Sequence, residues 1–241
     1  MIDLDVRDTT EAVAREAANR FVSIVADAIE RQGIARVALS GGSTPKLVYP
    51  LLLEPVRRDA IDWSAVELFW GDERAVPPDH PESNFGVAYR MLISHVPDVR
   101  PSRLHRMQAE APDLDAAALA YETELRIAFG VRGETPPTFD LTWLGMGADG
   151  HTASLFPGSA ALDERERWAV ATRQPATGQR RMTLTFPVLD AARETIFVVT
   201  GADKAEALSR VRSGDPELPA ARVAGAAVHW IVDAAAAAQV A

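Results

Sequence analysis

The chain has 241 residues, a formal net charge of −9 at pH 7 and no cysteine. This length suits one large domain or two small ones, and 47% hydrophobic with 24% charged residues is typical of a soluble globular protein. The acidic balance argues against nucleic acid or an anionic membrane as partner, because either needs a basic surface. With no apolar stretch long enough to span a bilayer, no signal peptide and no disulfide, we expect a cytoplasmic location.

Apolar runs alternate with helical patterns along the chain. The spacing predicts a helix over 9–33, a buried strand over 36–40, a helix from Pro45 that Pro50 kinks or ends early, and a strand over 66–70. A helix over 82–96, a strand over 103–107, a helix over 113–130 and a strand over 139–145 follow. The remaining elements are strands over 168–173, 182–186, 194–201 and 227–232, with a helix over 202–211.

This alternation predicts the α/β class, with a largely parallel sheet covered by helices on both faces. No internal repeat or linker marks a boundary, so we expect a single domain over 1–241. Ligands of such folds bind beyond the carboxyl ends of the strands. The loops at those ends are therefore the candidate site.

The first strand-end loop reads LSGGSTPK. Gly41 and Gly42 allow the backbone to turn tightly, Ser43 and Thr44 offer hydroxyls, and Pro45 suits a first helical turn. Free N–H groups at a helix N-terminus suit a phosphate. The alternative is a plain strand-to-helix turn with a Ser or Thr cap.

The second loop reads WGDERAV and places Asp72, Glu73 and Arg74 directly after a strand. A carboxylate there would orient a base or hydroxyl, and a guanidinium would hold developing negative charge. The alternative is a solvated charged loop without function.

The third loop reads GMGADGHTASLFP, where Gly147 and Asp149 precede His151 at the expected start of a helix. An imidazole with a pKa of roughly 6.5 accepts protons near neutrality. Lone histidines are often structural, but the other four in this chain lack a glycine-rich strand-end setting. His151 is therefore the candidate base.

The fourth loop reads VVTGADKAEAL and places Lys204 in the first turn of a helix. An exposed helical lysine is the alternative interpretation. However, Lys46 and Lys204 are the only lysines in the chain, which favours a ligand contact for Lys204.

No metal-binding pattern accompanies these loops, and no cofactor is expected. The sequence also lacks a nucleophile elbow and a P-loop. The remaining chemistry is direct attack by water with a histidine as general base.

Five segments resemble the 6-phosphogluconolactonase family, which is related to glucosamine-6-phosphate isomerase. They are VALSGGSTPKLVYPLL, FWGDERAVPPDHPESNFG, LTWLGMGADGHTASLFPGS, RRMTLTFPVLDAAR and VVTGADKAEAL, in register through about residues 35 to 210. The resemblance implies a Rossmann-like three-layer αβα sandwich in one domain. It also implies hydrolysis of 6-phosphoglucono-δ-lactone, a small phosphosugar lactone, to 6-phosphogluconate.

The resemblance also assigns site residues. The catalytic candidates it implies are His151, Arg74, Asp72 and Asp149. The substrate- and phosphate-binding candidates are Gly41, Gly42, Ser43, Thr44, Asn84, Gly147, Arg181 and Lys204. The choice between Arg180 and Arg181 as the ligand contact is open, as is the oxyanion donor, for which Arg74 and the backbone of the 145–151 turn compete.

Two rival functions remain. Glucosamine-6-phosphate deaminases share the Asp-Gly-His turn but carry a glutamate five residues after the histidine, where this chain has Phe156. Their charged loop reads Asp-Glu-Tyr, whereas this one has Arg74 third. The other rival is a non-catalytic sugar-phosphate sensor, against which the retention of His151 argues. We expect a monomer or weak homo-oligomer.

Overall fold

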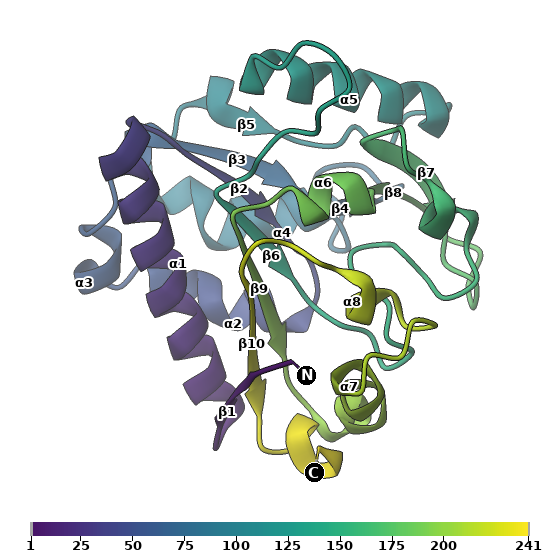
Figure 1. Cartoon of the computed structure of the whole chain (residues 1–241). Coiled ribbons are helices and arrows are strands. Elements are labelled where there is room, and N and C mark those ends of the chain that lie inside the picture. The colour runs from purple at the N-terminus through teal and green to yellow at the C-terminus, as the bar shows by residue number, and fades with distance from the viewer. Residues whose placement is uncertain (1, 241) are drawn as a thin grey trace.

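The centre of the computed structural model, which describes residues 2–240, is a seven-stranded sheet (Figure 1). From one edge to the other its strands are β1 (Leu4–Arg7), β10 (Val228–Asp233), β9 (Glu194–Val199), β6 (Leu141–Leu144), β2 (Ala35–Leu39), β3 (Val66–Trp70) and β5 (Leu104–His105). All neighbouring pairs run parallel, so every carboxyl end lies at the same edge. The predicted largely parallel sheet is confirmed.

Alternate residues of the strands face two separate cores. In β9, Ile196 and Val198 face one core, and Phe197 and Val199 face the other. A strand buried on both faces reads as a continuous apolar run, as these four residues do. The sheet is therefore the middle layer of three.

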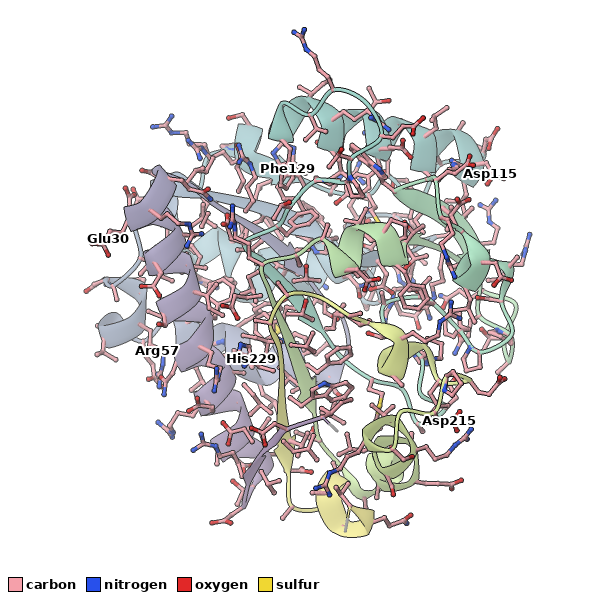
Figure 2. The ribbon with its side chains drawn as sticks, viewed as in Figure 1. Glu30, Arg57, Asp115, Phe129, Asp215 and His229 are labelled. Atoms are coloured by element: carbon pink, nitrogen blue, oxygen red, sulfur yellow. The ribbon has the colours of Figure 1, made fainter. Side chains whose placement is uncertain are left out.

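Helices cover both faces of the sheet. The first core packs against α1 (Thr10–Gln32), α2 (Ser43–Leu52) and α4 (Asn84–Met91); the second packs against α5 (Leu114–Phe129), α6 (Phe186–Asp190), α7 (Ala205–Arg212) and α8 (Pro219–Arg222). Figure 2 shows the exposed side chains of Glu30 on α1 and Asp115 on α5 at opposite margins of the molecule. The short helix α3 (Pro55–Arg58) follows α2.

Local signals place the helix ends. The Thr9 hydroxyl accepts a hydrogen bond from the N–H of Ala12 at the start of α1, and Gly33 ends that helix with a φ of 77°. Helix α2 continues through Pro50 and ends two residues later, at Leu52, in agreement with an early break. Within residues 2–240, no helix has the length and apolarity that crossing a membrane needs.

A smaller antiparallel sheet adjoins the large one. It consists of β4 (Asp72–Arg74), β8 (Arg180–Leu184) and β7 (Ala169–Arg173), in that order. The N–H of Leu184 donates to the carbonyl of Gly71, directly after β3, which joins the two sheets. The charged triplet predicted as a loop is thus a strand, because β8 supplies its hydrogen-bond partners.

Several expected elements differ in extent. Strand β1 was not predicted, and the expected strand over 103–107 is only Leu104–His105. The helix expected over 82–96 ends at Met91 and is followed by a 3₁₀ turn, η2 (Ile93–His95). The helix expected to start at His151 is not formed, and the chain instead makes a tight turn there, closed by a bridge between Thr152 and Leu155.

The order of connection reverses at the middle of the sheet. From β2 the chain builds outward to β3 and β5, and it then returns to β6 on the other side of β2 before building to β9 and β10. Loops that leave adjacent strands in opposite directions open a crevice at their carboxyl ends. The fold therefore predicts a ligand site between the loops after β2 and β6.

Candidate active site

A cavity of about 230 Å³ lies at this crevice. Loops after β2, β3, β6 and β9 line it, which are the four strand-end loops that the sequence singled out. Of the candidate residues, those in its lining are Gly41, Gly42, Ser43, Thr44, Asp72, Arg74, Gly147, His151, Arg181 and Lys204. Asn84 and Asp149 lie behind this lining and contact it.

The loop after β2 presents the N-terminus of α2 to the cavity. Gly42 is the N-cap, with a φ of 104° that favours glycine, and no side chain in the described part of the chain caps this end. The side chain of Asn84 lies against Gly41, where an added Cβ would come within 1.8 Å of the Asn84 Oδ1 atom. At a helix N-terminus without a side-chain cap, preceded by glycines that leave the backbone accessible, the free N–H groups can bind an anion.

The loop after β6 carries His151 and Asp149 as a pair. The Nδ1 atom of His151 lies 2.5 Å from Oδ1 of Asp149. Burial raises the pKa of the Asp149 carboxyl, but hydrogen bonds and electrostatic attraction from His151 and the local backbone together outweigh burial and hold that pKa below its ordinary value. An ionised Asp149 accepts a proton-bearing Nδ1, which leaves Nε2 as the basic nitrogen.

The turn around His151 is tightly constrained. A Cβ on Gly147 would lie 2.1 Å from Nδ1 of His151, so only glycine fits there. The hydroxyl of the buried Thr152 donates to the carbonyl of Gly145 at 2.9 Å. Ala153, with a φ of 49°, is the one non-glycine residue in the described chain with a positive φ, and it lines the cavity. Such backbone strain is often found at functional sites.

One face of His151 is covered by an apolar ring. The ring of the buried Phe156 packs against the imidazole with centroids 4.7 Å apart. No carboxylate occupies this position, and Asp149 is the acidic partner of the histidine instead.

Asp72 belongs to a buried network and does not hydrogen-bond to His151. Its Oδ2 atom accepts from the hydroxyl of Ser154 at 2.6 Å, and its Oδ1 atom accepts from the Asn84 amide at 3.0 Å. The guanidinium of Arg181 lies 3.9 Å from the same carboxylate. Among the described contacts, Asp72 therefore orients an arginine, whereas Asp149 orients the histidine.

Glu73 points away from the cavity and holds the start of α4. Its carboxylate accepts from the backbone N–H groups of Asn84 and Phe85 at 2.7 and 2.8 Å, and from the hydroxyl of Ser83. Burial raises the pKa of the Glu73 carboxyl, and these backbone hydrogen bonds oppose the rise. This member of the charged triplet supports the site from behind.

Two arginines face the cavity from the small sheet. Arg74 and Arg181 are directly opposite each other in the pairing of β4 with β8. Successive side chains of a strand alternate, so Arg180 points the other way, where its guanidinium donates to the carbonyl of Pro112 at 3.0 Å. The structure thus selects Arg181 over Arg180 as the residue that lines the cavity.

Lys204 ends the 3₁₀ turn η5 (Ala202–Lys204), immediately before α7. Its ammonium group lies 2.7 Å from the carboxylate of Asp203 and lines the cavity. The buried Asp233 accepts the N–H of Gly201 at 3.0 and 3.1 Å and the hydroxyl of Thr10 at 2.8 Å. The end of β10 therefore fastens the loop that carries Lys204.

Some residues at the site were not predicted from the sequence. Thr200 lines the cavity 3.5 Å from the hydroxyl of Thr44, and its place at the end of a strand was an available signal. Ser154 and Ala153 gave no signal, because their roles depend on the shape of the turn. Within residues 2–240, no group of three or more histidine and acidic side chains is arranged to hold a metal ion.

The fold and the site define an α/β protein whose ligand cavity lies at a topological switch point and combines a His–Asp pair with clustered cations. The family model for glucosamine-6-phosphate isomerases and 6-phosphogluconolactonase matches residues 8–231. The chain belongs to this family.

Individual relatives extend the comparison. The chain is 39% identical to a 6-phosphogluconolactonase of Streptomyces coelicolor, covering 98% of this chain and 94% of that one. It is 38% identical to one of Mycobacterium tuberculosis, over 98% and 97% of the two chains.

Solved structures show the same fold. The 6-phosphogluconolactonase of Trypanosoma brucei matches with a TM-score of 0.85 and 28% identity, over 100% of this chain and 99% of that one. A monomeric glucosamine-6-phosphate deaminase matches with a TM-score of 0.80 and 23% identity, over 99% and 100% of the chains. The deaminase shares the fold.

Proposed function

We propose that this chain hydrolyses 6-phosphoglucono-δ-lactone to 6-phosphogluconate, the second step of the oxidative pentose phosphate pathway, by histidine-assisted attack of water. Its curated relatives support its assignment as an enzyme, a hydrolase that acts on a lactone. The residue roles, the metal independence and the identity of the lactone are parts of the proposal.

The observation that carries the proposal is the His151–Asp149 pair beside a cluster of cations in one cavity. The pair provides a base whose Nε2 atom is free to accept a proton. Arg74, Arg181 and Lys204 supply positive charge within a chain of net charge −9. Because the whole-molecule field repels an anionic substrate, such clustering favours a specific anion site.

In the proposed reaction, Nε2 of His151 takes a proton from water as the water oxygen bonds to C1 of the lactone. The carbonyl π electrons move to the carbonyl oxygen, which forms a tetrahedral oxyanion. When the oxyanion collapses, the bond from C1 to the ring oxygen breaks, and the protonated His151 donates its proton to that oxygen. The base is thereby regenerated, and 6-phosphogluconate leaves.

Arg74 is the proposed oxyanion donor. The competing backbone turn already uses the N–H groups of Gly147, Gly150 and His151 in internal hydrogen bonds. The Arg74 guanidinium lines the cavity, and its Nε atom is buried with no hydrogen-bond partner in the described structure. A buried, unpaired donor of this kind is suited to charge that develops in the transition state.

The phosphate is proposed to bind at the N-terminus of α2, with Arg181 and Lys204 as its cations. Ser43 and Thr44 begin that helix, and all four residues line the cavity. Backbone N–H groups and side-chain cations together bind phosphate more tightly than either alone. Asn84 supports this site by filling the space against Gly41.

The structure gives no support to deaminase chemistry as a second function. Phe156 fills the face of His151 where that chemistry would need a carboxylate. Incubation with glucosamine 6-phosphate should therefore release no ammonia above the uncatalysed background.

The decisive experiment measures proton release from freshly generated 6-phosphoglucono-δ-lactone with the wild type and His151→Ala. We expect the variant to lose about 10²- to 10⁴-fold in kcat, the usual contribution of general acid–base catalysis. It should still bind 6-phosphogluconate in calorimetry. If the wild type binds this product but leaves the spontaneous rate unchanged, the chain is a sensor and the enzyme proposal fails.

Three expectations from the sequence stay predictions: a single domain over residues 1–241, a monomeric or weakly associated state, and a cytoplasmic location. Sedimentation of the purified protein tests the second directly.

A further inference from the structure

The two cavity arginines form a pair of like charges that needs support. Arg74 and Arg181 are directly opposite in the β4–β8 ladder, an arrangement that destabilises a sheet when nothing compensates. Burial lowers the pKa of the Arg181 guanidinium, and the neighbouring charge of Arg74 lowers it further. Asp72, at 3.9 Å, is the nearest carboxylate to Arg181.

A second set of contacts reaches both arginines from outside the cavity. The Nη2 atom of Arg181 donates to Oε1 of Gln179 at 2.9 Å, and Nε2 of Gln179 donates to Oε2 of Glu82 at 3.3 Å. The backbone carbonyl of Glu82 accepts from Nη1 of Arg74 at 2.7 Å. We call Glu82 and Gln179 the rim clasp, since together they connect the two guanidinium groups.

The rim clasp joins segments that are far apart in the sequence. Glu82 directly precedes Ser83, the N-cap of α4, and Gln179 ends the turn that connects β7 to β8. Neither residue lines the cavity of about 230 Å³. Gln179 therefore acts on a ligand in this cavity only through Arg181, whereas Glu82 also lines an adjoining cavity that shares Ser43 and Arg74 with it.

In the rim clasp, the charged residue, Glu82, does not contact Arg181 through its side chain; the neutral residue, Gln179, does. A carboxylate in direct contact would form a strong, charge-assisted pair with the guanidinium, and a phosphate would have to displace it. The neutral amide of Gln179 lies between the Glu82 carboxylate and the Arg181 guanidinium. The Glu82 carboxylate still offsets the two positive charges, but from a longer distance. Gln179 thereby helps to orient Arg181 without adding a second carboxylate contact to the one with Asp72.

We propose that Glu82 and Gln179 are positioning residues that keep Arg181 aligned, and available to the phosphate of the substrate, while the cavity is empty. The inference rests on the proposed function, because it assigns Arg181 to the substrate phosphate. Arg74 is held through a backbone carbonyl, so changes to the side chains of the clasp act on Arg181.

The first test replaces the amide with an apolar side chain. Gln179→Leu should raise the KM for the lactone and the calorimetric Kd for 6-phosphogluconate about tenfold, equivalent to about 1.4 kcal/mol, with kcat changed less than about twofold. Gln174→Leu is the matched control: it lies in the same turn, and its side chain accepts from Thr177 rather than from an arginine. It should leave KM and Kd unchanged.

The second test varies charge. Glu82→Ala removes the acceptor of Gln179 and should raise KM about threefold, whereas Glu82→Gln keeps an acceptor and should restore most of the affinity. Gln179→Glu places a carboxylate on Arg181 and should raise KM more than Gln179→Leu does. That additional rise should shrink at high salt, because ions screen the new charge.

The possible results distinguish a positioning role of the clasp from a purely structural one. They also distinguish a failure of the clasp proposal from a failure of the proposed function. If Gln179→Leu lowers only the melting temperature, or changes KM no more than Gln174→Leu does, the clasp proposal is wrong. An equal effect of Glu82→Gln and Glu82→Ala also overturns it. If the wild type neither hydrolyses the lactone nor binds 6-phosphogluconate, the proposed function fails before the variants are compared.

Discussion

Gly147 has no room for a side chain, because His151 and Asp149 fold back over it. An added Cβ would lie 2.1 Å from Nδ1 and 2.2 Å from Cε1 of His151. The imidazole would have to move, and a base displaced by about 1 Å loses on the order of 10²-fold in rate.

Gly147→Ala should therefore lower kcat about 100-fold while leaving the circular dichroism spectrum unchanged. Gly145→Ala is the informative comparison, since its Cβ would meet nothing closer than the carbonyl of Val198 at 4.0 Å. Steady-state lactone hydrolysis of both variants checks the prediction. Equal losses in the two variants would contradict a specific clash with His151.

The pairing of Asp149 with His151 makes a prediction about pH. The folded pKa of Asp149 lies below its ordinary value, so its stabilising contribution is fully present above an unfolded pKa of about 3.9 and is lost as pH falls through the lower folded pKa. Its side chain is 53% exposed, so this contribution is small, less than about 1 kcal/mol.

Asp149→Asn should accordingly be slightly less stable than the wild type in urea at pH 7, and this difference should shrink as the pH falls below about 3.9, the unfolded pKa of an aspartate. At pH 7 the variant should also lose at least about tenfold in kcat, because the amide no longer fixes the proton on Nδ1. A stability difference that grows as the solution is acidified would contradict the assigned pairing.

Some residues of the candidate site could be predicted from the sequence, and others could not. Gly41, Gly42, His151 and Lys204 were recognisable because glycines and basic residues directly after buried strands are typical of ligand-binding loops. The partner of His151 was harder to assign, since Asp72 and Asp149 both lie close to glycines in sequence. Only the backbone path decides which carboxylate reaches which side chain.

At the scale of elements, α2 contains a proline that the site does not need. Pro50 is exposed in the last turn and offers no N–H to the carbonyl of Lys46. Replacing it with alanine restores that hydrogen bond, although it also raises the conformational entropy of the unfolded chain.

We expect Pro50→Ala to stabilise the protein by about 1 kcal/mol, the balance of helix propensity against unfolded-state entropy. Chemical denaturation measures this directly. Product affinity should be unchanged, because the affected turn is at the far end of the helix from Gly42. A loss of stability would show that Pro50 packs favourably in a way its exposure does not suggest.

Element boundaries were the weakest sequence predictions for physical reasons. Strand β1 is four residues long, and although its apolar and charged residues alternate, so short a run is a weak signal. Strand β4 consists of Asp72, Glu73 and Arg74, whose pairing with β8 is a long-range event. Strands β2, β3 and β9 were recognisable because burial on both faces requires continuous apolar runs.

At the scale of the whole molecule, the charge of −9 repels an anion such as the proposed substrate, whereas the cationic side chains of the cavity would attract it. The repulsion acts over long distances, so salt screens it first: the Debye length falls from about 30 Å at 0.01 M to about 8 Å at 0.15 M ionic strength. Attraction inside the cavity acts over a few ångströms and is screened less.

The value of kcat/KM should therefore rise as sodium chloride is increased from about 10 to about 150 mM, and fall only at higher salt. A series of initial rates at low lactone concentration measures it. A monotonic fall from the lowest salt would show that the cationic cluster, rather than the net charge, controls the approach of the substrate.

The position of β10 has a consequence for how the protein is made. A chain growing on the ribosome contains every residue of the cavity lining once Lys204 has been added. Asp233, which fastens the Gly201 loop, and the partner strand of β1 arrive only with β10. Translation that stops before β10 leaves β1 without its partner strand, β9 with an unpaired edge and the Lys204 loop unfastened, so we expect an unfinished chain to be inactive and readily degraded.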